Sequence, residues 1–447
     1  MVRQTHLRRV SAISSFSLAL ISLPLYAISA AKGLMRPTGS TGLSPTAFVS
    51  ESAPARPPLG GSRFPVLDGL RGLAAIGVAV FHYMLGPAQK LPWVARAAHF
   101  CKLSPLSLDT FFILSGFLIG GMLLRVKDAP NYYRAFYQRR SLRILPLYYS
   151  WIGLFFVLYF TAHLAPPHGI RRSFYLASYI FFFQSFLPAI INSNCMLVPT
   201  WTLVAEEYFY LLIPVCIRRM SSRGLVKVLL GVMILAPLFR AVLFKFIGHE
   251  SAWADMAVQY WPPCRADALA MGVLLAAIWR SRELRQWLQE HLLLYKCGML
   301  AGFGLAILLD WMTDSHFRYC HLINAAFGRT VQELACLSLI VYLICRPEGA
   351  FGRFLCSNIM RELGKISYCI YIIHWGILWM IFRFVLHTAI GQNPWLDFAV
   401  TPIALLISIA IAALSWKYFE LPLLRRTSGV PRPVSIPTIT ERQAQTA

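Results

Sequence analysis

One apolar stretch near the start of the chain, FPVLDGLRGLAAIGVAVFHYML at residues 64–85, holds Asp68, Arg71 and His82. A charge at the centre of a bilayer costs roughly 2.5–3.5 kcal/mol on insertion scales, so such side chains need a reason to be there. Arg71 and His82 are eleven positions apart, which on an α-helix returns to nearly the same face after a rise of roughly 16 Å. Histidine suits general-base catalysis, because its ordinary pKa lies close to neutral pH. The spacing therefore predicts a helix face with an arginine near one end and a candidate base toward the other.

Each of these residues also has a simpler explanation. Arg71 alone could extend to lipid headgroups, and His82 alone could be a polar group satisfied at the interface. Asp68 lies three positions before Arg71, within reach of an intrahelical ion pair. The joint spacing, together with polar groups on other apolar runs, favours a functional site.

The run PTWTLVAEEYFYLLIP places two adjacent carboxylates, Glu206 and Glu207, in an apolar segment. They point about 100° apart on a helix, so we expect each to have its own partner, while Thr202, Glu206 and Tyr210 share a face. Other runs carry further candidates for the bundle interior: Asp109, Ser115, Arg265, Asp267, Ser367, Tyr371, His374 and Glu420. Ionisable groups in membrane segments usually face the bundle interior or a water-filled cavity and mark a reaction site or a pathway.

The elements that must position these groups are membrane-spanning helices. Of the 447 residues, 57% are apolar and 14% are charged. In soluble domains about a quarter of the residues are charged. Because lipid offers backbone polar groups no partner, we expect an all-α, polytopic helical bundle rather than a β-barrel. A spanning run needs about 20 mostly apolar residues. The eleven candidates after residue 64 are 66–85, 109–125, 144–162, 173–190, 199–217, 224–243, 264–279, 294–311, 329–345, 366–386 and 396–416.

The net charge of +23 comes from lysines and arginines that cluster between the apolar runs, for example at 125–143. The positive-inside rule explains these clusters, so no nucleic-acid partner is expected. Loops 248–263 and 388–397 contain neither Lys nor Arg, which places the basic clusters and both ends of the core in the cytoplasm of a bacterial-type inner membrane. Two cytoplasmic ends require an even number of crossings. We therefore predict about ten spans, with segment 173–190 re-entrant or interfacial.

The chain divides into three predicted parts. Residues 1–63 form an N-terminal extension, in which an apolar segment at 10–31 is typical of a signal peptide or of an element along the membrane. A Pro-, Gly- and Ser-rich linker follows that segment. Residues 64–425 form the transmembrane domain and residues 426–447 a disordered cytoplasmic tail. The ten cysteines lack the spacing of zinc ligands, so no metal site is expected.

A set of motifs occurs in an order that resembles one family. The motifs are LDGLRGLAAIGVAVFH, FFILSGFLI, RRSLRILPLYY, PTWTLVAEEYFYLLIP, RADALAMG, GKISYCIYIIH and YFELP. Together they are similar to the acyltransferase 3 family of integral-membrane O-acyltransferases, over residues 64–425. Two features depart from the family pattern. One is the N-terminal extension, and the other is that only residues 426–447 follow the core, where some relatives carry a soluble esterase-like domain.

The resemblance implies about ten spans and the transfer of an acyl group, most often acetyl. The donor would be cytoplasmic acyl-CoA, a co-substrate rather than a bound cofactor. The acceptor would be a hydroxyl of a carbohydrate or glycolipid, such as surface or extracellular polysaccharide of the cell envelope. The family's Arg-x10-His pair falls on Arg71 and His82, and its glutamates fall on Glu206, with Glu207 beside it, and on Glu420.

The roles that the resemblance implies fit the chemistry of these side chains. His82 would act as the base or as a transient covalent carrier of the acyl group, with Glu206 orienting its imidazolium. The family's Arg-x-x-Arg element falls on Arg140 and Arg143; these arginines and Arg139 would bind CoA phosphates, unless they are ordinary positive-inside residues. Arg71 would meet the pantetheine or pyrophosphate, and the remaining candidates would contact substrate. The rival interpretation is a proton-coupled transporter, although the segments show no internal repeat.

Overall fold

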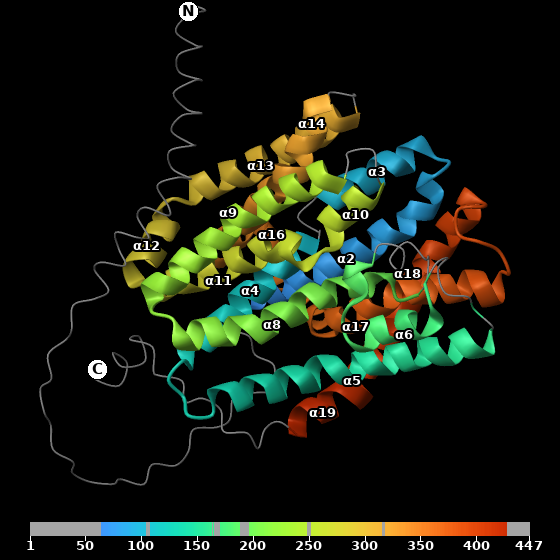
Figure 1. Ribbon diagram of the computed structural model, residues 1–447, viewed down its shortest axis with the longest axis horizontal. Coiled ribbons are helices and arrows are strands. Elements are labelled where there is room, and N and C mark those ends of the chain that lie inside the picture. The colour runs from blue at the N-terminus through green and yellow to red at the C-terminus, as the bar shows by residue number, and fades with distance from the viewer. Residues whose placement is uncertain are drawn as a thin grey trace, which may run out of the picture.

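The computed structural model describes residues 64–103, 108–162, 164, 170–187, 196–247, 252–314 and 318–426. Within these residues every regular element is a helix, and nine helices are long and apolar enough to cross a membrane (Figure 1). The predicted all-α, multi-pass membrane bundle is confirmed. The nine are built on α2 (Pro65–Ala88), α4 (Leu108–Arg125), α5 (Tyr132–Thr161), α8 (Trp201–Arg219), α9 (Ser222–Ile247), α13 (Leu292–Asp314), α15 (Arg329–Cys345), α17 (Asn358–Met380) and α18 (Pro394–Ser415).

The two remaining predicted segments fold as shorter helices. Segment 264–279 was also predicted to span. It becomes α11 (Ala266–Arg280), which follows the 3-10 turn η3 (Pro262–Arg265) and, with 15 residues, is not one of the nine helices. Segment 173–190 contributes α6 (Arg172–Ile180), whose nine residues extend only about 13.5 Å, against a hydrocarbon core of about 30 Å. The chain turns directly after α6, where Phe182 has a positive φ of 55°. Its described part is thus too short to span as a helix, and the expectation that the segment is re-entrant or interfacial stays a prediction.

Local chemistry explains where several of these helices begin. Pro65 and Pro394 lie in the first turns of α2 and α18, where a missing N–H costs no hydrogen bond. The Asn393 side chain accepts from the first N–H groups of α18, and Ser357 caps α17 in the same way. The shorter elements are α3 (Pro92–Leu103), α10 (Ala252–Tyr260), α12 (Arg282–Glu290), α14 (Arg318–Ile323), α16 (Ala350–Leu355), α19 (Leu421–Arg426), η1 (Gln184–Phe186), η2 (Val198–Thr200) and the π-helical turns η4 (Asn324–Gly328), η5 (Ile381–Val385) and η6 (Trp416–Glu420).

Glycines set the closest helix contacts. On α2 a Cβ at Gly72 would lie 2.7 Å from the backbone nitrogen of Gly364 on α17, so the two backbones touch there. On α4 a Cβ at Gly116 or Gly120 would press on α11, and one at Gly272 of α11 would press back on α4. Small residues allow this close approach between membrane helices, where no hydrophobic effect drives association. The two crossings, α2 with α17 and α4 with α11, form the centre of the bundle.

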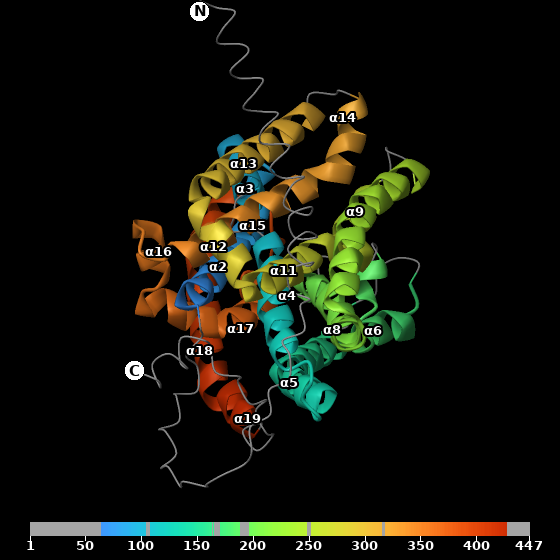
Figure 2. The same cartoon turned by 90° about the vertical axis from the view of Figure 1, so that its left-hand side faces the viewer.

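The outer helices present apolar side chains to the surroundings. Figure 2 places α2, α4, α11 and α17 in the middle, with α9 and α5 toward the outside. Residues of α13, α18 and α9 are mostly not buried, and large exposed apolar side chains such as Ile234, Leu235 and Leu406 lie on these outer helices. Contiguous exposed apolar surface on this scale fits contact with lipid. The predicted N-terminal extension and all of the predicted tail beyond Arg426 lie outside the described residues.

Candidate functional site

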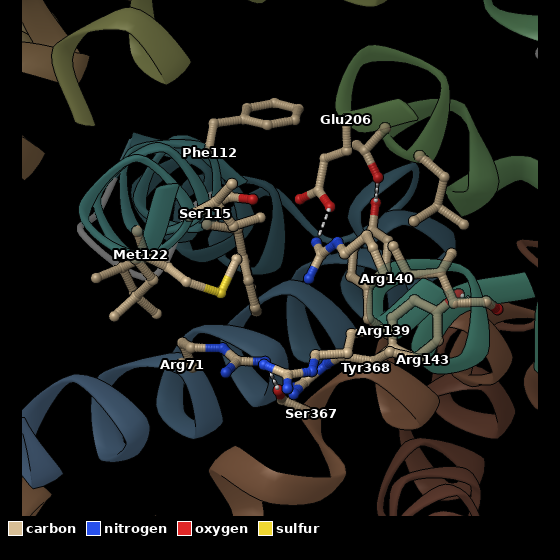
Figure 3. Close-up of a pocket in the computed structure, with 18 of the residues that line it drawn as sticks. Arg71, Phe112, Ser115, Met122, Arg139, Arg140, Arg143, Glu206, Ser367 and Tyr368 are labelled. Carbon is tan, nitrogen blue, oxygen red and sulfur yellow. Dashed lines mark hydrogen bonds and ion pairs between the residues drawn. The ribbon is translucent and has the colours of Figure 1, made fainter. Parts of the chain in front are cut away.

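A cavity of about 400 Å³ lies among α2, α4, α5, α8 and α17 (Figure 3). One part of its wall is apolar and includes Phe112 and Met122. The polar side chains that line it are Arg71, Ser115, Arg139, Arg140, Arg143, Thr202, Glu206, Ser367, Tyr368 and Tyr371. Eight of the candidates named from sequence therefore meet at one cavity, although they come from five helices: Arg71, Ser115, Arg139, Arg140, Arg143, Glu206, Ser367 and Tyr371.

The α2–α17 crossing brings Arg71 to the cavity. Its Nη2 donates a hydrogen bond of 3.4 Å to Ser367 Oγ, and that hydroxyl donates to the Gly364 carbonyl at 2.9 Å. Figure 3 shows the Arg143 side chain reaching the same place from α5. The predicted intrahelical pair was wrong: within the described chain no ion pair joins Asp68 and Arg71, because the arginine side chain turns across to α17.

Glu206 is the centre of a hydrogen-bonded group at the α5–α8 side. Arg140 Nη2 lies 3.4 Å from Glu206 Oε2, and the Arg140 guanidinium packs over the Tyr210 ring at 3.9 Å. The Tyr210 hydroxyl donates to Glu206 and lies 2.8 Å from Ser115 Oγ. The predicted common face of Thr202, Glu206 and Tyr210 is confirmed. Glu207 points elsewhere, and its buried Oε1 has no hydrogen-bond partner within the described chain.

The charge along the cavity wall is unbalanced. Four arginines face one carboxylate, Glu206, among the described lining residues. Positive charges with reduced access to water repel one another and are stabilised by a counter-charge. Guanidinium groups bind phosphate through paired N–H donors. This wall is therefore suited to a ligand that carries several negative charges.

Tyr371 of α17 lines the cavity on the side nearest to the histidines. Its hydroxyl donates to the Pro199 carbonyl at 2.8 Å and accepts from Thr202 Oγ1 at 2.8 Å. The ring of His374 follows, with a centroid 5.9 Å from that of Tyr371, and His374 Nε2 lies 3.2 Å from His82 Nδ1. His82 and His374 thus lie behind Tyr371 and are not among the residues that line the cavity.

The predicted contact between Glu206 and His82 was wrong. Glu206 is held by Arg140 and Tyr210 on the cavity wall, whereas the ring next to His82 is that of His374. His374 was among the candidates expected in the bundle interior, but the sequence gave no partner for this histidine. The partner depends on how α17 crosses α2, which spacing within one helix does not contain.

Asp109 and Arg265, both predicted to bind substrate, bind each other in a second polar cluster. Arg265 donates to Asp109, and both side chains are buried. Beside them Arg240 makes a two-bond pair with Asp267, at 2.8 and 3.3 Å. The full cluster comprises Arg240, Arg265, Arg329, Asp109, Asp267 and Glu333. None of the six lines the cavity, so this geometry gives Asp109 and Arg265 a structural explanation.

Arg240 and Glu333 were not among the residues predicted from the sequence. Each is a single charge inside an apolar run, APLFRAVLF or VQELACLSLIV, and this was the signal that could have found them. Tyr368 and Leu424 were also missed, and both line the cavity. Tyr368 follows Ser367 directly, but Leu424 is one of many apolar residues on the last helix, and nothing in the sequence distinguishes it.

A family profile described as an acyltransferase domain matches residues 64–415. The chain belongs to the acyltransferase 3 family. Relatives include O-acetyltransferase OatA of Staphylococcus aureus (strain NCTC 8325 / PS 47), 25% identical over 381 residues, which are 81% of this chain and 57% of the relative. Another is the putative peptidoglycan O-acetyltransferase YrhL of Bacillus subtilis (strain 168), 26% identical over 383 residues, 82% of this chain and 55% of the relative. The chain thus spans little more than half the length of these relatives. No solved structure matches it significantly.

The family's motif residues occupy three places in the structure of this acyltransferase 3 chain. Arg71, Arg140, Arg143 and Glu206 line the cavity. His82 lies beyond the cavity end. Glu420, on the π-helical turn η6, is buried and accepts a hydrogen bond of 3.1 Å from Ser415 Oγ, and it does not line the cavity.

Proposed function

We propose that this protein is a membrane O-acyltransferase that moves an acyl group, acetyl in the simplest case, from acyl-CoA to a carbohydrate hydroxyl. The observation that carries the proposal is the excess of arginine on the wall of a cavity inside the bundle. Membership of the acyltransferase 3 family supports the same reaction class.

The donor fits the arginine-lined part of the cavity by charge. CoA carries several phosphate charges at one end and a thioester at the other. Arg143, Arg140 and Arg71 would bind the phosphates and the start of the pantetheine arm. The basic cluster of residues 125–143 lies at this end of α5, and the positive-inside rule assigns that end to the cytoplasm, where acyl-CoA is made. We therefore propose an inner membrane location with both ends of the core cytoplasmic.

The reaction requires a base beyond the phosphate site. His82 is eleven residues after Arg71 on α2, a rise of roughly 16 Å, and the extended pantetheine arm would carry the thioester along this direction past Tyr371. The acceptor hydroxyl attacks the thioester carbonyl carbon, a C–O bond forms and its proton passes to His82. The C–S bond breaks, and the CoA thiolate takes that proton. The products are the O-acyl ester and free CoA.

The acceptor is proposed from the relatives and from the topology. The printed names of the relatives are O-acetyltransferase and, for the Bacillus subtilis protein, putative peptidoglycan O-acetyltransferase. A carbohydrate of the cell envelope would approach from the side opposite to the arginines, which is also the side of His82. Donor and acceptor would then meet at the histidine from opposite faces of the membrane.

The proposal is tested with the purified full-length chain in lipid nanodiscs, supplied with acetyl-labelled acetyl-CoA and fragments of peptidoglycan or surface polysaccharide. We expect the release of CoA thiol to depend on the acceptor, with label in an ester on the glycan that mild alkali removes. Proton-coupled solute uptake in proteoliposomes, without consumption of thioester, would instead identify a transporter and refute the proposal.

A further inference from the structure

Two imidazole rings, that of the half-buried His82 and that of the buried His374, meet where α2 crosses α17. His82 Nδ1 and His374 Nε2 are 3.2 Å apart, and the ring centroids are 5.0 Å apart. The His374 side chain has no exposed surface. Its own backbone carbonyl accepts a hydrogen bond of 3.0 Å from the Tyr83 hydroxyl. The residue is therefore fixed at both its backbone and its ring.

The neighbours of these two rings assign their protons. His374 Nδ1 lies 2.8 Å from the Tyr371 carbonyl and 3.2 Å from the Ile370 carbonyl. Carbonyl oxygens only accept, so Nδ1 of His374 carries the proton, and in the neutral ring Nε2 presents a lone pair. That lone pair faces His82 Nδ1, which also lies 2.9 Å from the Val78 carbonyl. With acceptors on both sides, His82 Nδ1 carries a proton as well.

The same assignment decides which atom of His82 can act as a base. In a neutral imidazole one nitrogen is a donor and the other an acceptor. Because Nδ1 of His82 is the donor, Nε2 holds the free lone pair. A histidine without such a partner exchanges between two tautomers, and only one of them presents the lone pair at Nε2.

We propose that His374 is the positioning residue for His82 in the reaction proposed above. Its Nε2 shares the His82 Nδ1–H with the Val78 carbonyl, and this side-chain acceptor adds to the preference for one tautomer and one ring orientation. When His82 Nε2 takes the acceptor proton, the bond from Nδ1–H to His374 becomes charge-assisted and shortens. In the Ser-His-Asp triad a carboxylate performs this function; here a neutral imidazole, anchored by the Tyr371 carbonyl, takes its place. The Tyr371 carbonyl thus links the cavity end to the base.

The described residues offer no third ligand with which this histidine pair could bind a metal ion. Across the described residues no group of three His, Cys, Asp or Glu side chains is arranged to hold a metal ion. The nearest other rings are apolar or aromatic: Phe81 and Trp375 lie 5.2 and 6.1 Å from His82 between ring centroids. His374 is therefore the hydrogen-bonding side chain next to His82.

The experiment compares three variants of the full-length protein in nanodiscs. His374→Gln keeps an amide oxygen near the position of Nε2 and so keeps an acceptor for His82. His374→Phe keeps a ring but removes the acceptor. Tyr83→Phe is the matched control, because it deletes a hydrogen bond to the same residue and leaves the pair of rings intact. Each variant is assayed for kcat and for KM with acetyl-CoA across pH. Nitrogen-15 NMR of labelled histidines reports the tautomer of His82. The His82 signals are assigned as those that disappear in His82→Gln.

We expect His374→Phe to lower kcat by about 100-fold or more, within the range of general-base effects, with KM for acetyl-CoA nearly unchanged. His374→Gln and Tyr83→Phe should keep most of kcat. In the NMR spectra His82 should be protonated almost wholly at Nδ1 in the wild type and in His374→Gln. In His374→Phe the Val78 carbonyl remains as an acceptor, but the share of the Nε2–H tautomer should rise measurably.

Retention of both kcat and the Nδ1–H tautomer in His374→Phe would overturn the proposal. So would wild-type His82 protonated at Nε2. If the wild-type protein consumes no thioester, the proposed function fails, while the NMR measurement still decides whether His374 sets the tautomer.

Discussion

Replacing Arg143 with alanine tests the donor site most directly. Arg143 lines the cavity and makes no ion pair or hydrogen bond with another described residue. Arg140 is already bound to Glu206 and Arg71 to Ser367. The N–H groups of the Arg143 guanidinium therefore hold no hydrogen bond to another described residue and can bind a phosphate. We expect Arg143→Ala to raise the KM for acetyl-CoA while kcat changes little.

The size of the effect follows from the contact that is lost. A hydrogen bond to a charged group contributes about 1.5–3 kcal/mol, which corresponds to a rise in KM of roughly 10- to 150-fold. Arg134→Ala is the matched control. It removes the same charge from the same helix, but Arg134 is exposed and does not line the cavity. An exposed charge contributes about 1 kcal/mol or less, so the KM of this control should rise by less than about 5-fold.

The assay follows CoA thiol release at varied donor concentration, with equal amounts of inserted protein. Acetyl-pantetheine, which lacks the nucleotide phosphates of CoA, serves as a second donor. The Arg143→Ala change should not alter the KM for that donor, because the group that binds Arg143 is missing. An unchanged KM for acetyl-CoA, or an equal increase of the KM for acetyl-pantetheine, would show that Arg143 does not bind the phosphates of CoA and is an ordinary positive-inside residue.

Three further substitutions and one control probe the base and the helix packing around it. His82→Ala should lower transfer by at least about 100-fold while immunoblots of membranes show normal abundance; wild-type turnover would refute its role as base. Gly272→Ala places a Cβ against the α4 backbone and should cost about 1–3 kcal/mol by overpacking. Gly231→Ala, with nothing within 4 Å of its Cβ, should leave the thermal midpoint in detergent unchanged; equal midpoints for both would contradict the packing argument. Asp109→Asn leaves Arg265 buried without its counter-charge and should destabilise the protein by about 3–5 kcal/mol, and a thermal midpoint equal to the wild type would show that the pair is not structural.

The fold could be predicted from sequence because each signal was local. The apolar runs gave the spans, and the expected even number of crossings pointed to segment 173–190 as re-entrant or interfacial. Its helix, α6, is only nine residues long, and the chain turns at Phe182. These features are contained in length, hydropathy and turn chemistry, so no contact between distant segments was needed to find them.

The pairing of charged groups could not be predicted in this way. Spacing suggested Arg71 with Asp68 and His82 with Glu206, but Arg71 contacts Ser367 and His82 contacts His374. Both true partners are on α17, about 290 positions away. They meet α2 because Gly72 lets the two backbones touch. Helical periodicity shows which residues share a face, whereas the partner of that face is set by the crossing of two helices.

Charge balance explains why only one of the two polar regions is expected to bind an anion. The second polar cluster holds three arginines and three carboxylates, so its formal charge is zero and its arginines have counter-ions within the protein. The cavity wall holds four arginines and one carboxylate among its described lining residues, so a negatively charged ligand would improve its charge balance. Burying an excess of one charge costs free energy. A bound phosphate group would offset it, and for this reason an anionic ligand should stabilise the folded protein through Arg143 rather than through Arg265.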